Sequence, residues 1–140
     1  MLSYPARIKH NKKENAYEVS FPDVKGCYTY GETIEEAKNY AKEALTGCLD
    51  SSFERNIEIP VPSKLKGDDI YYISPELSVA FAIILRRERE RRKLSQIQVA
   101  GELEISYQAY QRFENPRKSN PTLKTISKIE NVLGINLIQI

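Results

Sequence analysis

The spacing of the apolar residues changes along the chain, and this change limits what the N-terminal part can fold into. In the stretch AYEVSF, Tyr17, Val19 and Phe21 alternate with polar residues, the period of a strand with one buried face. From residue 34 the apolar residues instead recur every three or four positions, the period of a helix with one buried face. The sequence therefore predicts a small sheet covered by one long helix, an α+β arrangement.

Three strands are expected before that helix. Residues 6–9 and 16–21 form a hairpin around the polar turn HNKKEN, and CYTY forms a third short strand that ends at Gly31. A later stretch, IEIPVPSKLKGDD, contains two prolines and a glycine and suits a linker or an irregular edge. The following IYYIS is a candidate fourth strand that closes the sheet, so we place the end of the first domain at residue 73, giving a domain of residues 1–73.

The long helix has a clear start signal. Thr33 and Glu36 have the spacing of a capping box, in which the Thr33 hydroxyl accepts from the Glu36 amide and the Glu36 carboxylate accepts in return. One apolar face follows at helical spacing. Its members are Ile34, Ala37, Ala41, Ala44, Leu45, Cys48, Leu49 and Phe53.

A second domain, residues 74–140, is predicted to be helical. Ser74 and Pro75 suit a cap and the first helical position. Apolar residues on more than one side of the next helix predict burial against two partners, its own domain and a second subunit. The run RRERERRK, residues 86–93, is either a solvated helix end held by pairs four residues apart or a nucleic-acid contact.

Further helices are marked by their caps. Ser95 and Ser106 precede two short amphipathic segments, and a third helix has Pro121 near its start and Gly134 at its end. The tail INLIQI, residues 135–140, carries no charge and is β-prone, so we expect it to pair with its copy in a dimer.

The two short segments meet the demands of a helix-turn-helix unit, in which a second helix enters the major groove of DNA while the first braces it. Ala100 supplies the small residue where the helices cross, and Ile105 the apolar residue at the turn. Tyr110 and Phe113, three apart, anchor the second helix to the core.

The face left outward has the chemistry of DNA contacts. Gln and Arg side chains match the donor and acceptor pattern of adenine and guanine edges, and alanine or an aromatic ring suits a thymine methyl. The amide and backbone N–H groups of Gln96 suit a phosphate. The predicted DNA-binding residues are Gln96, Ser106, Tyr107, Gln108, Ala109, Gln111 and Arg112.

Charge and composition agree with a split of functions between the domains. Residues 1–70 carry ten basic and twelve acidic side chains, whereas residues 71–140 carry eleven basic and seven acidic ones, so only the second half suits a polyanion. No apolar run is long enough for a membrane span, and we expect a cytoplasmic protein. With Cys27, Cys48 and His10 as the only soft ligands, we expect reduced thiols and neither a metal nor a cofactor.

The motifs of both halves resemble known families. The second half, with Leu94-Ser95-Gln96 and Ile105-Ser106 among its matching residues, resembles the Cro/cI or Xre-like helix-turn-helix class. Glu104 stands where that class commonly has glycine, and a left-handed backbone there costs a non-glycine residue roughly 1 kcal/mol. The first half resembles the HicB antitoxin family, whose signature is seen here as Phe21-Pro22-Asp23, Gly26-Cys27, Gly31-Glu32-Thr33 and Glu36-Ala37.

The resemblance implies a degraded RNase H-like fold that is not an enzyme and that blocks HicA, a small basic toxin ribonuclease. It also implies a second domain that dimerises, or forms a higher even oligomer, and represses the shared operon at a palindromic operator. An acidic sheet edge would attract the toxin. We expect Asp23, Tyr28 and Tyr30 to form the toxin contact, although these tyrosines equally suit packing against the helix.

Three alternatives remain open at this stage. The first is a stand-alone transcription regulator whose N-terminal domain senses a ligand. The second is a metal-dependent nuclease, for which the sequence offers Glu18, Asp23 and Asp50 where several converging carboxylates are needed. The third is a helical bundle that serves only for dimerisation.

Overall fold

The computed structural model describes residues 2–137 and divides into two compact units, Leu2–Glu76 and the chain from Leu77 onward. We call them the sheet unit and the helical unit. Among the described residues no helix is long and apolar enough to cross a membrane.

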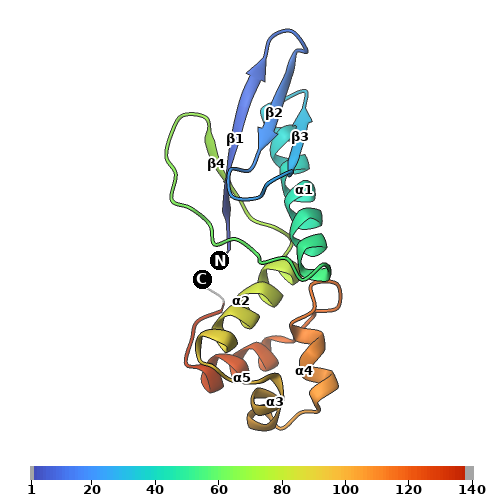
Figure 1. Cartoon of the computed structure of the whole chain (residues 1–140), viewed down its shortest axis with the longest axis vertical. Helices are drawn as coiled ribbons and strands as arrows, with labels where there is room; N and C mark the ends of the chain where they lie inside the picture. The colour runs from blue at the N-terminus through green and yellow to red at the C-terminus, as the bar shows by residue number, and fades with distance from the viewer. Residues whose placement is uncertain (1, 138–140) are drawn as a thin grey trace. The chain divides into compact units, whose positions relative to one another are not determined.

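The sheet unit contains four strands and one helix, as the sequence predicts (Figure 1). The strands lie in the order β3-β2-β1-β4, and every neighbouring pair is antiparallel. Helix α1 covers one face of this sheet, and the opposite face has no helix of its unit over it (Figure 1). In chain order the elements are β1 (Tyr4–Asn11), β2 (Ala16–Ser20), β3 (Tyr28–Gly31), α1 (Ile34–Glu54) and β4 (Ile70–Ile73).

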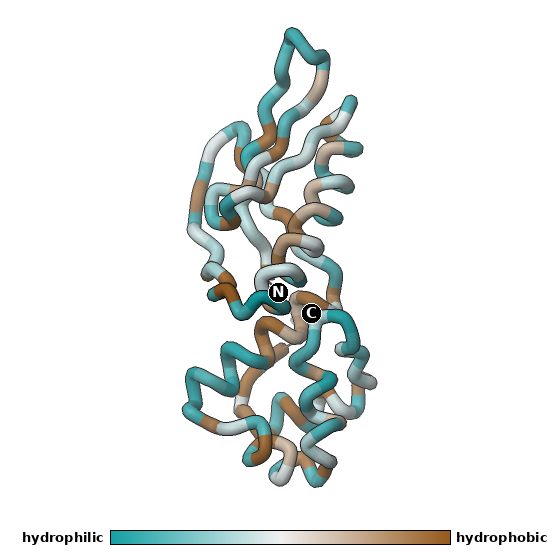
Figure 2. The backbone as a smooth tube through the Cα atoms, turned by 45° about the vertical axis from the view of Figure 1, so that its right-hand side comes forward, coloured by the Kyte–Doolittle hydropathy of each residue, from teal (hydrophilic) through white to brown (hydrophobic). Residues whose placement is uncertain are grey.

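The predicted start and buried face of α1 are confirmed. The Thr33 hydroxyl accepts from the Glu36 amide at 3.1 Å, while the Glu36 carboxylate accepts from the amide of Glu32, one residue earlier than the predicted Thr33. Along its length the α1 tube alternates between hydrophobic and hydrophilic segments (Figure 2). Its fully buried side chains are Ala37, Ala41, Leu45 and Leu49.

The helix approaches the sheet most closely at Gly31. A Cβ atom at this position would lie 2.5 Å from the backbone nitrogen of Ala37 and 2.8 Å from its Cα. Because these are backbone atoms at the start of a helix, they have little freedom to move aside. The absence of a side chain at Gly31 therefore sets how closely β3 packs on α1.

The segment between α1 and β4, residues 55–69, has neither helix nor strand but is fixed at several points. The Tyr4 hydroxyl donates to the carbonyl of Pro60 at 2.6 Å, and the Leu65 amide donates to the Tyr72 hydroxyl at 2.8 Å. Asp23 accepts from the Ser63 amide at 2.8 Å and also from the Ser63 hydroxyl. This stretch is therefore the irregular edge that its prolines suggested.

The predicted helix start at Ser74 and Pro75 is wrong, because residues 74–76 are not helical and α2 begins at Leu77. The amide of Glu76 donates to the Thr46 hydroxyl at 3.0 Å, and its carboxylate lies 3.6 Å from the Lys42 ammonium group. These contacts hold residue 76 against α1 inside the sheet unit. These contacts outweigh the tendency of Ser74 and Pro75 to start the helix.

The helical unit packs four helices around one core. Its elements are α2 (Leu77–Arg91), α3 (Gln96–Leu103), α4 (Tyr107–Phe113) and α5 (Leu123–Leu133). The burial predicted on more than one side of α2 is confirmed, whereas the second subunit stays a prediction. The core combines residues from all four helices with Leu137: Phe81, Leu85, Val99, Ala100, Leu103, Tyr110, Ile129, Leu133 and Leu137.

The predicted β tail, residues 135–140, lies partly outside the described residues. Its described part, residues 135–137, forms no strand. The amide of Leu137 donates to the Glu130 carboxylate at 2.7 Å, and the Leu137 side chain is buried in the helical core. The start of the tail therefore completes its own unit.

We expect Gly31→Ala to lower the free energy of unfolding by about 1–3 kcal/mol, because the added methyl group meets helix backbone. Urea unfolding of the full chain, followed by circular dichroism, measures the change. Gly47→Ala is the matched control, since a Cβ atom there meets nothing within 4 Å and the position lies inside α1. The control should raise stability by roughly 0.5–1 kcal/mol. Equal effects of the two substitutions would contradict the close approach.

Candidate functional site

Helices α3 and α4 form a helix-turn-helix arrangement with both predicted caps in place. The Ser95 hydroxyl accepts from the Gln98 amide at 3.0 Å, and the Gln98 side chain accepts from the Ser95 amide at 2.7 Å. The Ser106 hydroxyl accepts from the Ala109 amide at 3.1 Å and begins α4. Each hydroxyl satisfies a backbone N–H that has no partner inside its helix.

The turn between the two helices adopts the left-handed backbone that the sequence pattern predicts. Glu104 has φ 58° and ψ 41°, and the Ile105 amide donates to the carbonyl of Ala100 at 3.0 Å. Glycine adopts this conformation without strain, whereas Glu104 pays roughly 1 kcal/mol for it. The surrounding hydrogen bonds keep the turn in place despite this cost.

The predicted anchors of the two helices are confirmed. Ala100 and Tyr110 are buried, and Ile105 and Phe113 pack against the same core. The rings of Tyr110 and Phe113 meet edge to face with their centroids 6.5 Å apart. Burial raises the pKa of Tyr110, and the nearby Glu114 carboxylate raises it further.

A buried ion pair fixes the end of α4. Arg89 Nε donates to Glu114 Oε2 at 2.7 Å, and Arg89 Nη2 donates to Glu114 Oε1 at 3.0 Å. Arg89 Nη1 also donates to the Leu94 carbonyl at 2.8 Å, just before α3. The side chains are only 12% and 2% exposed, and the bond to Glu114 raises the pKa of Arg89. One guanidinium group therefore joins α2, the start of α3 and the end of α4.

The sequence interpretation missed this pair. Of the charged run 86–93, Arg86 pairs with Glu90 at 2.9 Å and Arg91 with Glu88 at 2.7 Å, as a solvated helix end should. Arg89 instead turns toward Glu114 and is largely shielded from solvent. A signal was present, because Arg89 follows the core residues Leu85 and Phe81 at helical spacing of four.

The outward face of α4 gathers most of the predicted DNA-binding residues. Ser106, Tyr107, Gln108, Gln111 and Arg112 are exposed, and Ala109 is half-buried. The Gln111 amide donates to the Tyr107 hydroxyl at 2.9 Å, so these two side chains form a pair on the surface. The structure thus brings amide, hydroxyl and guanidinium donors together on one short helix.

The Gln96 side chain does not belong to this outward face, because it bonds to a buried carboxylate. Its side-chain amide donates to Glu114 Oε1 at 3.2 Å and so joins the buried ion pair. The second amide hydrogen and the backbone N–H groups at the start of α3 are the groups left for a phosphate. Its predicted role therefore depends on the same network that fixes α4.

In the sheet unit, Tyr28 and Tyr30 do not pack against the helix. They stand on β3, on the face of the sheet opposite α1, and are 71% and 67% exposed. Asp23 is half-buried and bound to Ser63. It does not line the groove that holds both tyrosines, but it lines a second groove together with Tyr28 and residues of α1. The structure therefore groups the tyrosines and gives Asp23 a role in holding residues 55–69.

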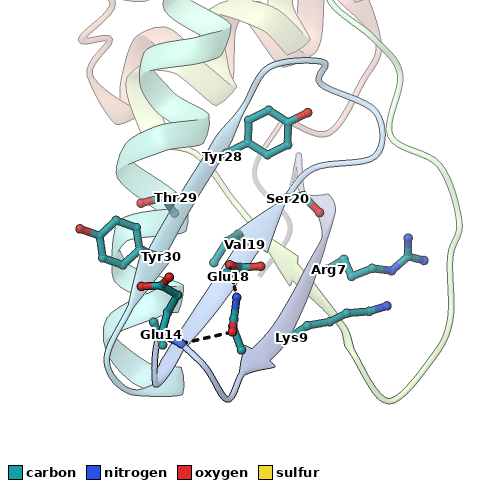
Figure 3. A pocket seen from close by; sticks show the side chains of 11 residues that line it. Arg7, Lys9, Glu14, Glu18, Val19, Ser20, Tyr28, Thr29 and Tyr30 are labelled. Carbon is teal, nitrogen blue, oxygen red and sulfur yellow. Dashed lines mark hydrogen bonds between the residues drawn. The ribbon is translucent and has the colours of Figure 1, made fainter.

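Charged side chains that the sequence interpretation did not select as toxin contacts share the groove with the tyrosines (Figure 3). Arg7 and Lys9 come from β1, Glu18 from β2, and Glu14 from the turn between these strands. The groove is therefore lined by both acidic and basic side chains, and it is not the wholly acidic edge that the sequence predicts. The sequence signal for Arg7, Lys9 and Glu18 was the alternation along β1 and β2, in which they occupy the positions between residues that face the helix.

No set of three or more His, Cys, Asp or Glu side chains within residues 2–137 is placed to hold a metal ion. Cys27 is a buried free thiol and Cys48 a half-buried one.

Comparisons with known proteins find similarity along both units. A family model described as the HicB-like antitoxin of bacterial toxin-antitoxin systems matches residues 3–81, and a helix-turn-helix model matches residues 85–140. Antitoxin HicB 1 of Photorhabdus laumondii is 32% identical over 136 residues, 97% of this chain and 84% of that protein. Antitoxin HicB of Escherichia coli K12 is 36% identical over 99 residues, 71% of this chain and 70% of that protein.

Among solved structures, a toxin-antitoxin complex from Streptococcus pneumoniae aligns with 96% of this chain and 90% of that chain, at 20% identity and a TM-score of 0.48.

We expect Arg89→Met to lower the free energy of unfolding by about 3–5 kcal/mol, because it leaves the buried Glu114 carboxylate without its cation. Thermal and urea unfolding of the full chain measure the loss. Arg91→Met is the matched control, since Arg91 is 64% exposed and its pair with Glu88 contributes at most about 1 kcal/mol. Similar losses in the two variants would show that the Arg89 pair contributes no more than a surface pair.

Proposed function

The chain belongs to the HicB-like antitoxin family, and from this membership we propose that it binds and neutralises a HicA-like mRNA-cleaving toxin and represses its own operon. The observation that carries the proposal is the joining of a sheet unit matched by the antitoxin family with a helix-turn-helix unit in one chain. The protein acts by binding rather than by catalysis, in the cytoplasm where toxin, mRNA and operator meet.

In this proposal residues 1–73 contact the toxin. Tyr28 and Tyr30 serve as contact residues, since exposed tyrosines combine a large apolar area with a hydroxyl group and are enriched at interfaces. Asp23 supports this surface from the preceding loop through its bonds to Ser63. The toxin loses access to its RNA when this surface covers its own RNA-binding face.

Residues 74–140 bind operator DNA in the same proposal. Helix α4 enters the major groove, where Gln108, Gln111 and Arg112 contact base edges and Tyr107 and Ala109 contact apolar groups. Ser106 and Gln96 meet phosphates at the helix starts. The buried Arg89 and Glu114 pair supports this assignment because it holds α4 at a fixed angle to its neighbours.

DNA binding requires a dimer or a higher even oligomer. Helix α4 has seven residues and reads too few base pairs for useful specificity alone. Two copies related by a two-fold axis read a palindromic operator with the half-sites about one helical turn apart. The helical unit supplies the dimer contact in this proposal.

The test is co-purification of the chain with the product of the neighbouring small gene. Both proteins are expressed together, only one carries a tag, and the neighbour is also expressed alone to measure growth and RNA integrity. A stable complex that restores growth is the expected result. A neighbour that neither binds nor degrades RNA would refute the antitoxin function and favour a regulator with a ligand-sensing sheet unit.

For the DNA half we expect Arg112→Ala to weaken binding to the DNA upstream of its own gene by about 1–3 kcal/mol, with an unchanged melting temperature. Arg112 is exposed on α4, so its removal leaves the core intact. Electrophoretic mobility shifts at several salt concentrations measure the affinity. Arg55→Ala, on the exposed end of α1, removes the same charge outside the helix-turn-helix. An equal loss in both variants would mean that charge alone, and not base contact, sets the affinity.

A further inference from the structure

We infer that the open face of the sheet unit is a docking groove for a positively charged segment of the toxin, held between the rings of Tyr28 and Tyr30 and the carboxylates of Glu14 and Glu18. The groove has a volume of about 940 Å³. The inference rests on the proposed antitoxin function and specifies the site and the charge of the partner.

The strand register builds this face from matched positions. Glu18 lies opposite Lys9 on one side and Tyr30 on the other, and Ser20 in the same way joins Arg7 to Tyr28. Directly opposed residues of antiparallel strands project from the same face of the sheet. Figure 3 shows the result, with the tyrosines on β3, the basic side chains on β1 and Glu18 between them.

The tyrosines give the groove an apolar wall that the unit itself leaves uncovered. Two neighbouring rings on one strand, each more than two-thirds exposed, form a patch that a partner can bury. Replacing an interface tyrosine by alanine is among the substitutions that weaken binding most, because the rigid tyrosine ring buries a large area at small entropic cost. These two rings are therefore the expected anchors.

The basic side chains of the groove have a carboxylate partner within the sheet unit, whereas the acidic side chains of the groove form no ion pair among the described residues. Arg7 and Lys9 lie 3.2 and 3.9 Å from the Asp69 carboxylate, which compensates part of their charge. Glu14 and Glu18 form no ion pair with any residue between 2 and 137, and Glu18 accepts one hydrogen bond from the Asn11 amide at 2.8 Å. The end of the groove near Tyr30 is therefore available to a cation.

This distribution of charge favours some partners of the groove over others. A phosphate backbone would meet the unpaired carboxylates of Glu14 and Glu18, so single-stranded RNA is disfavoured despite the exposed rings. A second copy related by a two-fold axis sets these carboxylates against Arg7 and Lys9 of the other copy, so self-association must be distinguished by the sedimentation experiment. Lysine or arginine side chains of a protein partner both neutralise the carboxylates and stack on the tyrosine rings.

The test uses the full chain and the product of the neighbouring small gene. Binding constants are measured by titration calorimetry for the wild type, for Tyr28→Ala with Tyr30→Ala, and for Glu14→Lys with Glu18→Lys. Tyr40→Ala with Glu35→Lys is the matched control, because both residues are exposed on α1, which covers the other face, and neither lines a groove with Tyr28 or Tyr30. Melting curves and DNA binding by the helical unit verify that each variant folds.

We expect both groove variants to bind the partner at least about tenfold more weakly, and the control to stay within about twofold of the wild type. Wild-type affinity should also fall as salt is raised, more steeply than that of the charge-reversal variant. Wild-type binding with no loss in either groove variant would overturn the groove while leaving the antitoxin function intact. Absence of wild-type binding would overturn both.

Two further results would also overturn the inference. If the wild type binds single-stranded RNA and the tyrosine variant does not, the face is an RNA surface. If the groove variants lose self-association in sedimentation experiments but keep partner binding, the face joins two copies of this chain.

Discussion

The ion pair between Arg89 and Glu114 is the contact on which the geometry of the helical unit depends. It joins three helices through two bonds between the side chains and a third to the backbone carbonyl of Leu94. A buried charge is costly without its partner, so arrangements of α2 and α4 that separate the two groups are strongly disfavoured. Such a contact selects one crossing angle for α4, and the angle decides the direction in which the outward side chains are presented.

The sheet unit is organised by a different constraint, the covering of only one face of the sheet. Helix α1 packs closely on β3 because Gly31 has no side chain, and most buried strand residues, Val19 among them, turn toward the helix. Every second strand residue is then left on the open face. The same alternation that buries Val19 therefore displays Glu18 and places Tyr28 and Tyr30 in the groove.

Much of this structure was predictable from local patterns. The order of strands and helices, the caps at Thr33, Ser95 and Ser106, and the left-handed turn at Glu104 follow from spacing and side-chain chemistry within a few residues. The start of α2 was not predictable in this way. Ser74 and Pro75 have good capping chemistry, but contacts of Glu76 with Thr46 and Lys42, about thirty residues earlier, hold this segment out of the helix.

The sequence by itself determined the two-part organisation, the helix-turn-helix and the outward face of α4, because each depends on periodicity and on neighbours along the chain. Only the tertiary structure decided which partner each charged group meets. Arg89 departs from the charged run 86–93 and pairs with Glu114, and Asp23 accepts hydrogen bonds from Ser63. Glu14 and Glu18, beside the tyrosines, form no ion pair among residues 2–137. Electrostatic pairing depends on distance in space, and residues 25 or 40 positions apart carry no local signal of their approach.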